Sequence, residues 1–181
     1  EIASCLVGSE MCIRDRLFST LPAFAAGFGP WAFGMSVDQV LAIRTHGPYR
    51  AFSNGDLEKD NADFGGKARN FQFYFEDGRL RRIAIRTYEG KDLVQATQAW
   101  RDTYIALKSL HGPVETPDLA GASLDELANS AMSTVANSGK AQMAPVSQPE
   151  DAFVFSSFNS FRYQDTTYYM VTVNYDPPSP Q

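Results

Sequence analysis

Residues 71–88 read FQFYFEDGRLRRIAIRTY, and this run predicts an antiparallel β-hairpin. Apolar and polar side chains alternate on both sides of Glu76-Asp77-Gly78, a tripeptide typical of a tight turn. The alternation predicts which side chains face the core: Phe71, Phe73, Phe75, Ile83 and Ile85. Leu80 is out of phase with Ile83, which indicates a β-bulge or a turn position.

Helices are expected on both sides of this hairpin. A capping box at Ser36 and Gln39 begins the first, and His46-Gly47-Pro48 ends it, with glycine free to take a left-handed conformation. Its buried stripe is expected to contain Val37, Val40 and Leu41. The second helix is expected from about Lys91 to Leu110, capped by Asp92 and ended by His111-Gly112-Pro113. A third helix is expected to begin at Ser123.

The remaining segments are expected to be loops and two further strands. Asp56, Glu58, Asp60 and Asp63 precede Gly65-Gly66, and we interpret this stretch as a solvated acidic loop. Residues 138–151 are rich in Gly, Pro, Ser and Gln, which predicts a mobile loop. Residues 152–158 and 168–175 have the aromatic composition of strands. The fold class predicted is α+β in two layers, with helices packed on an antiparallel sheet.

A helix, His-Gly-Pro and strands occur twice along the chain. This pattern suggests a tandem repeat of one α+β unit, and chance recurrence of a common helix end is the alternative. The first unit, residues 31–88, resembles the SmpA/OmlA type of small outer-membrane-assembly protein. The residues that carry the resemblance are Gly34-Met35-Ser36, Gln39-Val40, Gly47-Pro48, and residues 73–80 followed by Ile83. That resemblance implies two helices on a three-stranded sheet and a binding role, and a tandem pair resembles the β-lactamase-inhibitory-protein architecture.

Composition excludes several classes of protein. The chain of 181 residues has 16 Lys and Arg against 21 Asp and Glu, a net charge of −5, so no basic face for nucleic acid is expected. Hydrophobic residues make up 44%, which is typical of a globular domain. No uncharged apolar run reaches the length of about 18 residues that a membrane-spanning helix needs.

The first residues of the chain resemble a sequence of laboratory origin. Residues 6–16, LVGSEMCIRDR, resemble the translation of a transposase end used in sequencing libraries, so we interpret residues 1–16 as an adapter artefact rather than a genuine N-terminal peptide. Both cysteines, Cys5 and Cys12, lie there, so the genuine chain is expected to be free of cysteine. Disulfides and cysteine chemistry are then not expected.

Residues 17–25 resemble the end of an export signal. They are uncharged and apolar and finish in Ala23-x-Ala25, a pattern that suits signal peptidase. A buried N-terminal strand is the alternative. The first interpretation predicts a periplasmic or secreted protein, with residues 26–181 as its single domain.

Few residues suggest catalysis. His46 and His111 both end a helix, where partial positive charge is favoured, so capping is expected of them rather than metal binding or general-base catalysis. The pattern Gly-x-Ser-x-Gly, which would support a Ser-His-Asp triad, does not occur. We therefore expect no metal, no cofactor and no catalytic residue.

The residues of one hairpin face favour a binding function. Opposite the Phe and Ile side chains we expect Gln72, Tyr74, Arg82, Arg86 and Tyr88. Tyr and Arg are enriched in binding hot spots, although an ordinary solvent-facing sheet is the alternative. The sequence thus predicts an exported, non-catalytic protein-binding module of the bacterial cell envelope. An inhibitor or immunity protein against a hydrolase or toxin, and a hydrolase that uses His46 or His111, are the other hypotheses.

Overall fold

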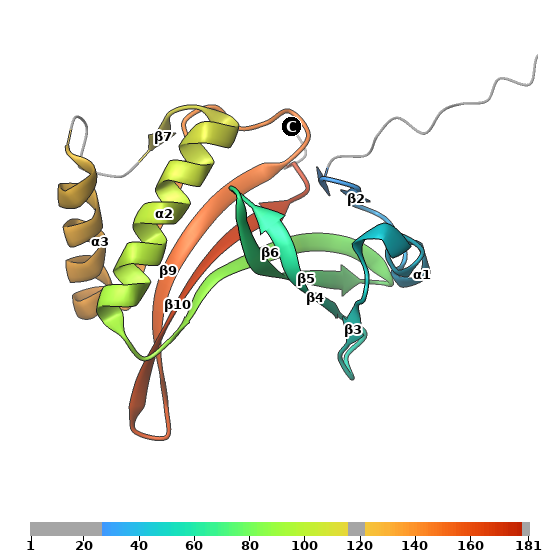
Figure 1. Ribbon diagram of the computed structural model, residues 1–181, viewed down its shortest axis with the longest axis horizontal. Coiled ribbons are helices and arrows are strands. Elements are labelled where there is room, and N and C mark those ends of the chain that lie inside the picture. Colours follow the sequence, from blue (N-terminus) through green and yellow to red (C-terminus); the bar gives the residue numbers. More distant parts are fainter. Residues whose placement is uncertain (1–26, 116–121, 179–181) are drawn as a thin grey trace, which may run out of the picture.

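The structure is a computed structural model, and it describes residues 27–115 and 122–178 (Figure 1). Residues 1–16 and 17–25, interpreted above as an artefact and an export signal, lie outside this range. The elements in chain order are β1 (Gly27–Phe28), β2 (Trp31–Ala32), α1 (Val37–Leu41), the 3₁₀ helix η1 (Arg44–His46), β3 (Arg50–Ala51), β4 (Leu57–Phe64), β5 (Lys67–Glu76), β6 (Arg79–Gly90), α2 (Leu93–His111), β7 (Val114–Glu115), α3 (Leu124–Ser138), β8 (Lys140–Pro145), β9 (Phe153–Tyr163) and β10 (Thr166–Asp176).

A large antiparallel sheet dominates the fold. Its eight strands lie in the order β3-β4-β5-β6-β10-β9-β8-β7, so β6 and β10 meet at its centre. Figure 1 shows a strongly curved sheet, with α2 and α3 together at one end and α1 at the other. The predicted α+β class is therefore correct in its coarse form, with strands predominating over helices.

The helix starts follow their capping residues. Ser36 with Gln39, and Ser123 with Glu126, form complete capping boxes, and the Asp92 carboxylate accepts from the N–H groups of Val94 and Gln95. These three predictions are confirmed. Each cap satisfies backbone donors that have no partner inside the first turn of a helix.

The end of the first helix differs from the prediction. α1 stops at Leu41, and a separate 3₁₀ helix ends at His46. Gly47 is extended, with φ of −70°, so it does not take the left-handed conformation that its position suggested. Of the predicted buried stripe, Val40 is fully buried but Leu41 is 41% exposed. A helix this short buries only one narrow edge, and Leu41 lies outside that edge.

The hairpin predicted from residues 71–88 is confirmed and is longer than expected. β5 and β6 pair from Asn70↔Arg86 to Glu76↔Arg79, and Asp77 and Gly78 form the turn with positive φ. The expected irregularity lies between Tyr74 and Phe75, where the register shifts. This shift brings Leu80 into the core, fully buried.

Two segments interpreted as loops contain strands. Residues 57–64 form β4, in which Leu57, Ala62 and Phe64 are buried, so three of the four acidic residues lie on a strand rather than in a solvated loop, and Asp56 directly precedes it. Of residues 138–151, Lys140–Pro145 form β8, with Met143 buried against the core. In both segments pairing with a neighbouring strand overrides a polar composition, because the sheet supplies partners for the backbone.

One face of the sheet builds the hydrophobic core. The N-terminal segment contributes Trp31, whose ring lies 5.1 Å from that of Phe73. From α2, Trp100 lies 5.9 Å from Phe158, and α2 also contacts α3, β6 and β10. A single cluster of buried side chains includes both tryptophans. In the described residues no helix has the length and apolarity needed to cross a membrane.

Candidate functional site

The opposite face of the sheet forms a hollow of about 590 Å³. Five consecutive strands line it, namely β5, β6, β10, β9 and β8. We call this surface the open face, and its lining residues are Gln72, Tyr74, Arg82, Ala84, Arg86, Lys140, Gln142, Phe155, Ser157, Asn159, Met170, Thr172 and Asn174. Four of the five residues predicted for a binding face, Gln72, Tyr74, Arg82 and Arg86, are brought together here.

Tyr88, the fifth predicted residue, lies elsewhere. The pairing of β6 with β10 shifts register, so that Thr172 opposes Arg86 and Val171 opposes Tyr88. Thr87 is the extra residue, and the strand beyond it presents the other face. Tyr88 therefore packs against the core, and its hydroxyl accepts a hydrogen bond from the Asp92 N–H at the start of α2, at 3.1 Å. The expectation that Tyr88 shares a face with Arg86 is wrong because of this bulge.

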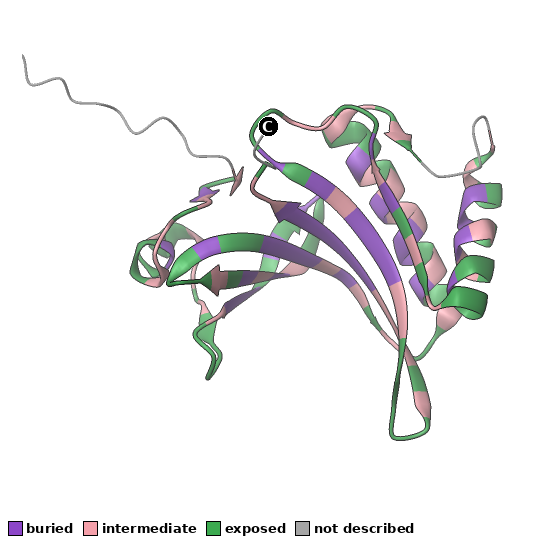
Figure 2. Ribbon diagram, turned by 180° about the vertical axis from the view of Figure 1, so that it is seen from behind, coloured by how far each residue is buried: buried purple, intermediate pink, exposed green. Residues whose placement is uncertain are grey.

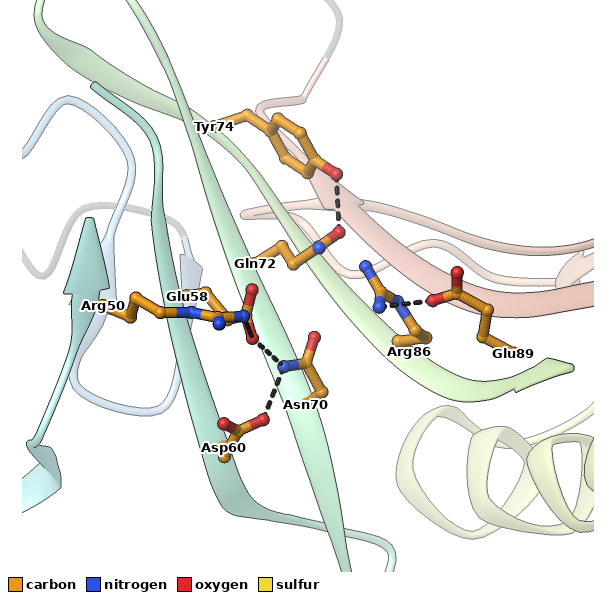
Figure 3. A network of polar contacts seen from close by, with 8 residues as sticks. All are labelled: Arg50, Glu58, Asp60, Asn70, Gln72, Tyr74, Arg86 and Glu89. Atoms are coloured by element: carbon orange, nitrogen blue, oxygen red, sulfur yellow. Dashed lines mark hydrogen bonds and ion pairs between the residues drawn. The ribbon is translucent and has the colours of Figure 1, made fainter. Parts of the chain in front are cut away.

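Two arginines of the open face are held by acidic neighbours. Arg82 donates from Nε and Nη2 to the two carboxylate oxygens of Asp176, both at 2.6 Å. This hydrogen bonding raises the pKa of Arg82 above its ordinary value. Arg86 forms an ion pair with Glu89, and its Nε is buried without a hydrogen-bond partner among the described residues (Figure 3).

Tyr74 stands at one side of the hollow. Its hydroxyl donates to the Gln72 amide oxygen at 2.7 Å (Figure 3). Burial raises the pKa of the Tyr74 hydroxyl, and the cations Arg86 and Arg82 oppose this effect. Tyr74 is thus a neutral hydrogen-bonding group with an aromatic surface, 38% exposed.

The floor of the hollow consists of neutral polar side chains that bind one another. Ser157 and Thr172 share a hydrogen bond of 2.9 Å between their hydroxyls. Asn174 donates to Thr172 at 3.3 Å, and Asn159 donates to Ser157 at 3.1 Å. Beside this network, the guanidinium of Arg82 lies 5.8 Å from the ring centre of Phe155. These side chains therefore hold one another in place and still offer hydrogen-bonding groups.

A second polar cluster lies next to the hollow, on β3, β4 and β5. The Glu58 carboxylate, on a residue only 5% exposed, accepts from Arg50 at 2.6 Å and from Asn70 at 2.9 Å. Asn70 also donates to Asp60 at 2.8 Å (Figure 3). These contacts help to explain why an acidic sequence forms a strand here, since the carboxylates of Glu58 and Asp60 both have a donor on a neighbouring strand.

The β9–β10 hairpin extends the open face beyond the body of the protein (Figures 1 and 2). Asn159 pairs with Met170, and Phe161 pairs with Tyr168, so their side chains lie on the same side as the hollow. The rings of Phe161 and Tyr168 stack with centres 5.7 Å apart, and Tyr163 is 60% exposed. The hairpin therefore carries an accessible aromatic surface that continues the hollow.

The two histidines lie among aromatic side chains. His46 ends η1 with its ring 5.2 Å from that of Trp31. His111 is the last residue of α2, and its Nε2 lies 2.9 Å from the Tyr175 hydroxyl. Burial lowers the pKa of His111, with Asp151 opposing the effect, so burial outweighs the positive charge expected at a helix end. Within residues 27–115 and 122–178, no three His, Cys, Asp or Glu side chains converge to hold a metal.

The part of the hollow that lies on β8 and β9 was missed from the sequence. Lys140 and Gln142 lie on β8, in the segment interpreted as a loop. Phe155, Ser157 and Asn159 alternate with the buried residues Val154, Ser156 and Phe158, and this alternation was the available signal for their common face. That they meet Gln72 and Arg86 depends on the strand order, which no local pattern encodes.

Comparisons with known proteins found no matching family model, curated protein or solved structure.

Proposed function

We propose that this chain is an exported, non-catalytic protein-binding module of the bacterial cell envelope, which holds a protein partner on the open face. The observation that supports it most is the hollow itself, lined by Tyr74, Arg82 and Arg86 and continued by an aromatic hairpin. Tyr and Arg are the residue types that most often anchor interfaces, and Ser and Asn supply adaptable hydrogen bonds beside them.

Export is supported by the sequence of residues 17–25, which ends in Ala23-x-Ala25. The absence of catalysis is proposed from the surroundings of the histidines. His46 packs on Trp31, and His111 bonds Tyr175, and these contacts of two half-buried rings favour a structural role for both. The surroundings of these two histidines do not favour a hydrolase over a binding protein.

The finer architecture supports a repeat, and we infer that the domain is two-layered and built from two related units. Each unit has a capped helix, His-Gly-Pro, a two-residue strand and three further strands. The order β3-β4-β5-β6 is mirrored by β7-β8-β9-β10, and α3 is an addition in the second unit. A tandem repeat is what the resemblance to the β-lactamase-inhibitory-protein architecture implies, and the role in that architecture is binding. The first unit has one α-helix, a 3₁₀ helix and four strands, in place of the two helices and three strands that the resemblance to the outer-membrane-assembly proteins implies.

A capture experiment tests the proposal. The full chain, immobilised, is exposed to envelope extract of the source organism beside a variant with Tyr74→Ala, Arg82→Ala and Arg86→Ala. A control variant carries Val94→Ala, Lys108→Ala and Leu110→Ala, which are exposed positions on α2. Circular dichroism melting of all three proteins ensures that they are folded.

The expected result is one protein retained stoichiometrically by the wild type and the control and lost from the open-face variant. Retention of the same proteins by all three baits, or of none by the wild type, would overturn the proposal. If the captured protein is an enzyme that loses its activity in the complex, the inhibitor hypothesis is favoured.

A further inference from the structure

The charged side chains that line the hollow are all basic, although the whole chain is acidic. The lining contains the cations Arg82, Arg86 and Lys140 and no carboxylate, whereas the full chain has a net charge of −5. Asp176 binds one edge of the Arg82 guanidinium through two hydrogen bonds, but the other two cations are less engaged. Lys140 is exposed and forms no ion pair with any described residue.

Arg86 keeps donor capacity that the protein does not use. It contacts Glu89 through Nη1, while its Nε has no acceptor among the described residues. A buried donor without an acceptor costs free energy, and a small reorientation of the guanidinium toward an incoming carboxylate would recover it. Glu89 is 42% exposed and can be solvated when it is displaced.

The strand register places a neutral path between these two cations. Arg86 opposes Thr172, Thr172 opposes Ser157, and Ser157 opposes Gln142, which is two residues from Lys140 on the same side of β8. Neighbouring strands lie about 4.8 Å apart, so three strand spacings place Arg86 about 14 Å from Gln142, and Lys140 lies about 7 Å further along β8. A short peptide segment that crosses the strands would cover this path, with hydroxyl and amide groups beneath its backbone.

Given the proposed function, on which this inference depends, we propose that the hollow receives an acidic segment of the protein partner, whose carboxylates bind Arg86 and Lys140. The neutral floor binds the backbone of that segment. The cations select its charge, because a basic or apolar segment would desolvate Arg86 and Lys140 without supplying a carboxylate in place of the water that it displaces.

The probe is a phage-displayed library of random dodecapeptides, selected on the immobilised full chain. Parallel selections use the variant Arg86→Met with Lys140→Met, and the variant Lys108→Met, which removes an exposed cation from α2. The expected result is enrichment of Asp and Glu on the wild type and on Lys108→Met, and no such enrichment on the double variant. Calorimetric titration with an enriched peptide, and with its Asn/Gln analogue, then measures affinity at two salt concentrations.

We expect the loss of the carboxylates, or of the two cations, to weaken binding about tenfold or more and to reduce its salt dependence. If the enriched peptides require Tyr74 for binding but carry no excess of acidic residues, this inference would be overturned and the proposed function would remain intact. If no enriched peptide binds the wild type more tightly than the variant with Tyr74, Arg82 and Arg86 replaced, both this inference and the proposed function would be contradicted. Binding of anionic lipid vesicles or nucleic acid in place of acidic peptides would also contradict it.

Discussion

Single residues decide how closely the parts of this protein approach one another. At the tip of the β4–β5 hairpin, Gly65 and Gly66 both have positive φ, 61° and 77°, as a two-residue turn between paired strands requires. The two differ in surroundings. A Cβ on Gly65 would lie 2.8 Å from Cβ of Ala106 on α2, whereas a Cβ on Gly66 would meet nothing within 4 Å.

Alanine at these two positions separates strain from contact. Gly66→Ala is expected to destabilise the protein by about 1 kcal/mol through backbone strain alone. Gly65→Ala has the same strain and a clash with α2, so we expect a loss larger by about 1–2 kcal/mol. Urea unfolding followed by circular dichroism measures both, and equal losses would show that α2 adapts to the extra methyl group.

His111 is the second residue whose surroundings make a prediction. Burial lowers its pKa below the ordinary 6.5, so the unfolded chain binds more protons than the folded chain as pH falls below 6.5. Stability contributed by neutral His111 is therefore complete above pH 6.5 and is lost as pH falls toward the pKa of the folded state. His111→Gln retains a group that can bond Tyr175 and does not titrate. Thermal melting between pH 5 and pH 8 should show a shallower acid slope for this variant, and an unchanged slope would contradict the assignment.

At the scale of elements, the β9–β10 hairpin combines exposure with backbone strain. Its turn residues Gln164 and Asp165 have φ of 44° and 58°, a conformation that glycine and asparagine adopt most readily. The strand pair ends at Tyr163↔Thr166, directly beside the aromatic surface proposed for binding. The turn is therefore a site where a residue suited to positive φ should stabilise the hairpin.

Relief of this strain should stabilise the protein. We expect Asp165→Gly to raise stability by about 0.5–1 kcal/mol, because glycine takes positive φ without steric cost. Gln164→Ala is the control, since alanine gains nothing in that conformation. Differential scanning calorimetry measures both variants, and a lower melting temperature for Asp165→Gly would show that Asp165 stabilises the turn by another contact.

At the scale of the whole molecule, the two inferred units share one core. Trp31 lies near the N-terminal end and Trp100 on α2, yet one buried cluster includes both. The seam between the units is the pairing of β6 with β10, where the fully buried residues Ile85 and Val173 oppose each other. A continuous core across this seam predicts cooperative unfolding.

Single-tryptophan variants test this cooperativity. Trp31→Phe and Trp100→Phe each leave one fluorescent reporter, and both reporters should unfold at the midpoint that circular dichroism gives for the same variant. Ile85→Ala at the seam, added to each variant, should destabilise both signals equally, by about 2–5 kcal/mol. Separate transitions for the two reporters would indicate units that fold independently.

Local sequence patterns determined the caps, the central hairpin, its bulge and four of the five residues expected on the binding face. These features depend on contacts within a few residues, such as the bond of Ser36 with Gln39, or on the two-residue period of a strand. The two segments predicted as loops are strands because partners outside the segment bind them. Asn70 donates to Glu58 on β4, and β9 pairs with β8.

Only the tertiary structure decided the site. The register shift opposite Val171 and Thr172 removes Tyr88 from the open face, and the strand order brings Lys140 and Ser157 to the hollow that Arg86 lines. Both depend on which strands pair and in what register, which is a property of long-range backbone hydrogen bonds and of the shared core. The sequence by itself thus determined the elements and the kind of side chains they present, and the tertiary structure determined which of them form one surface.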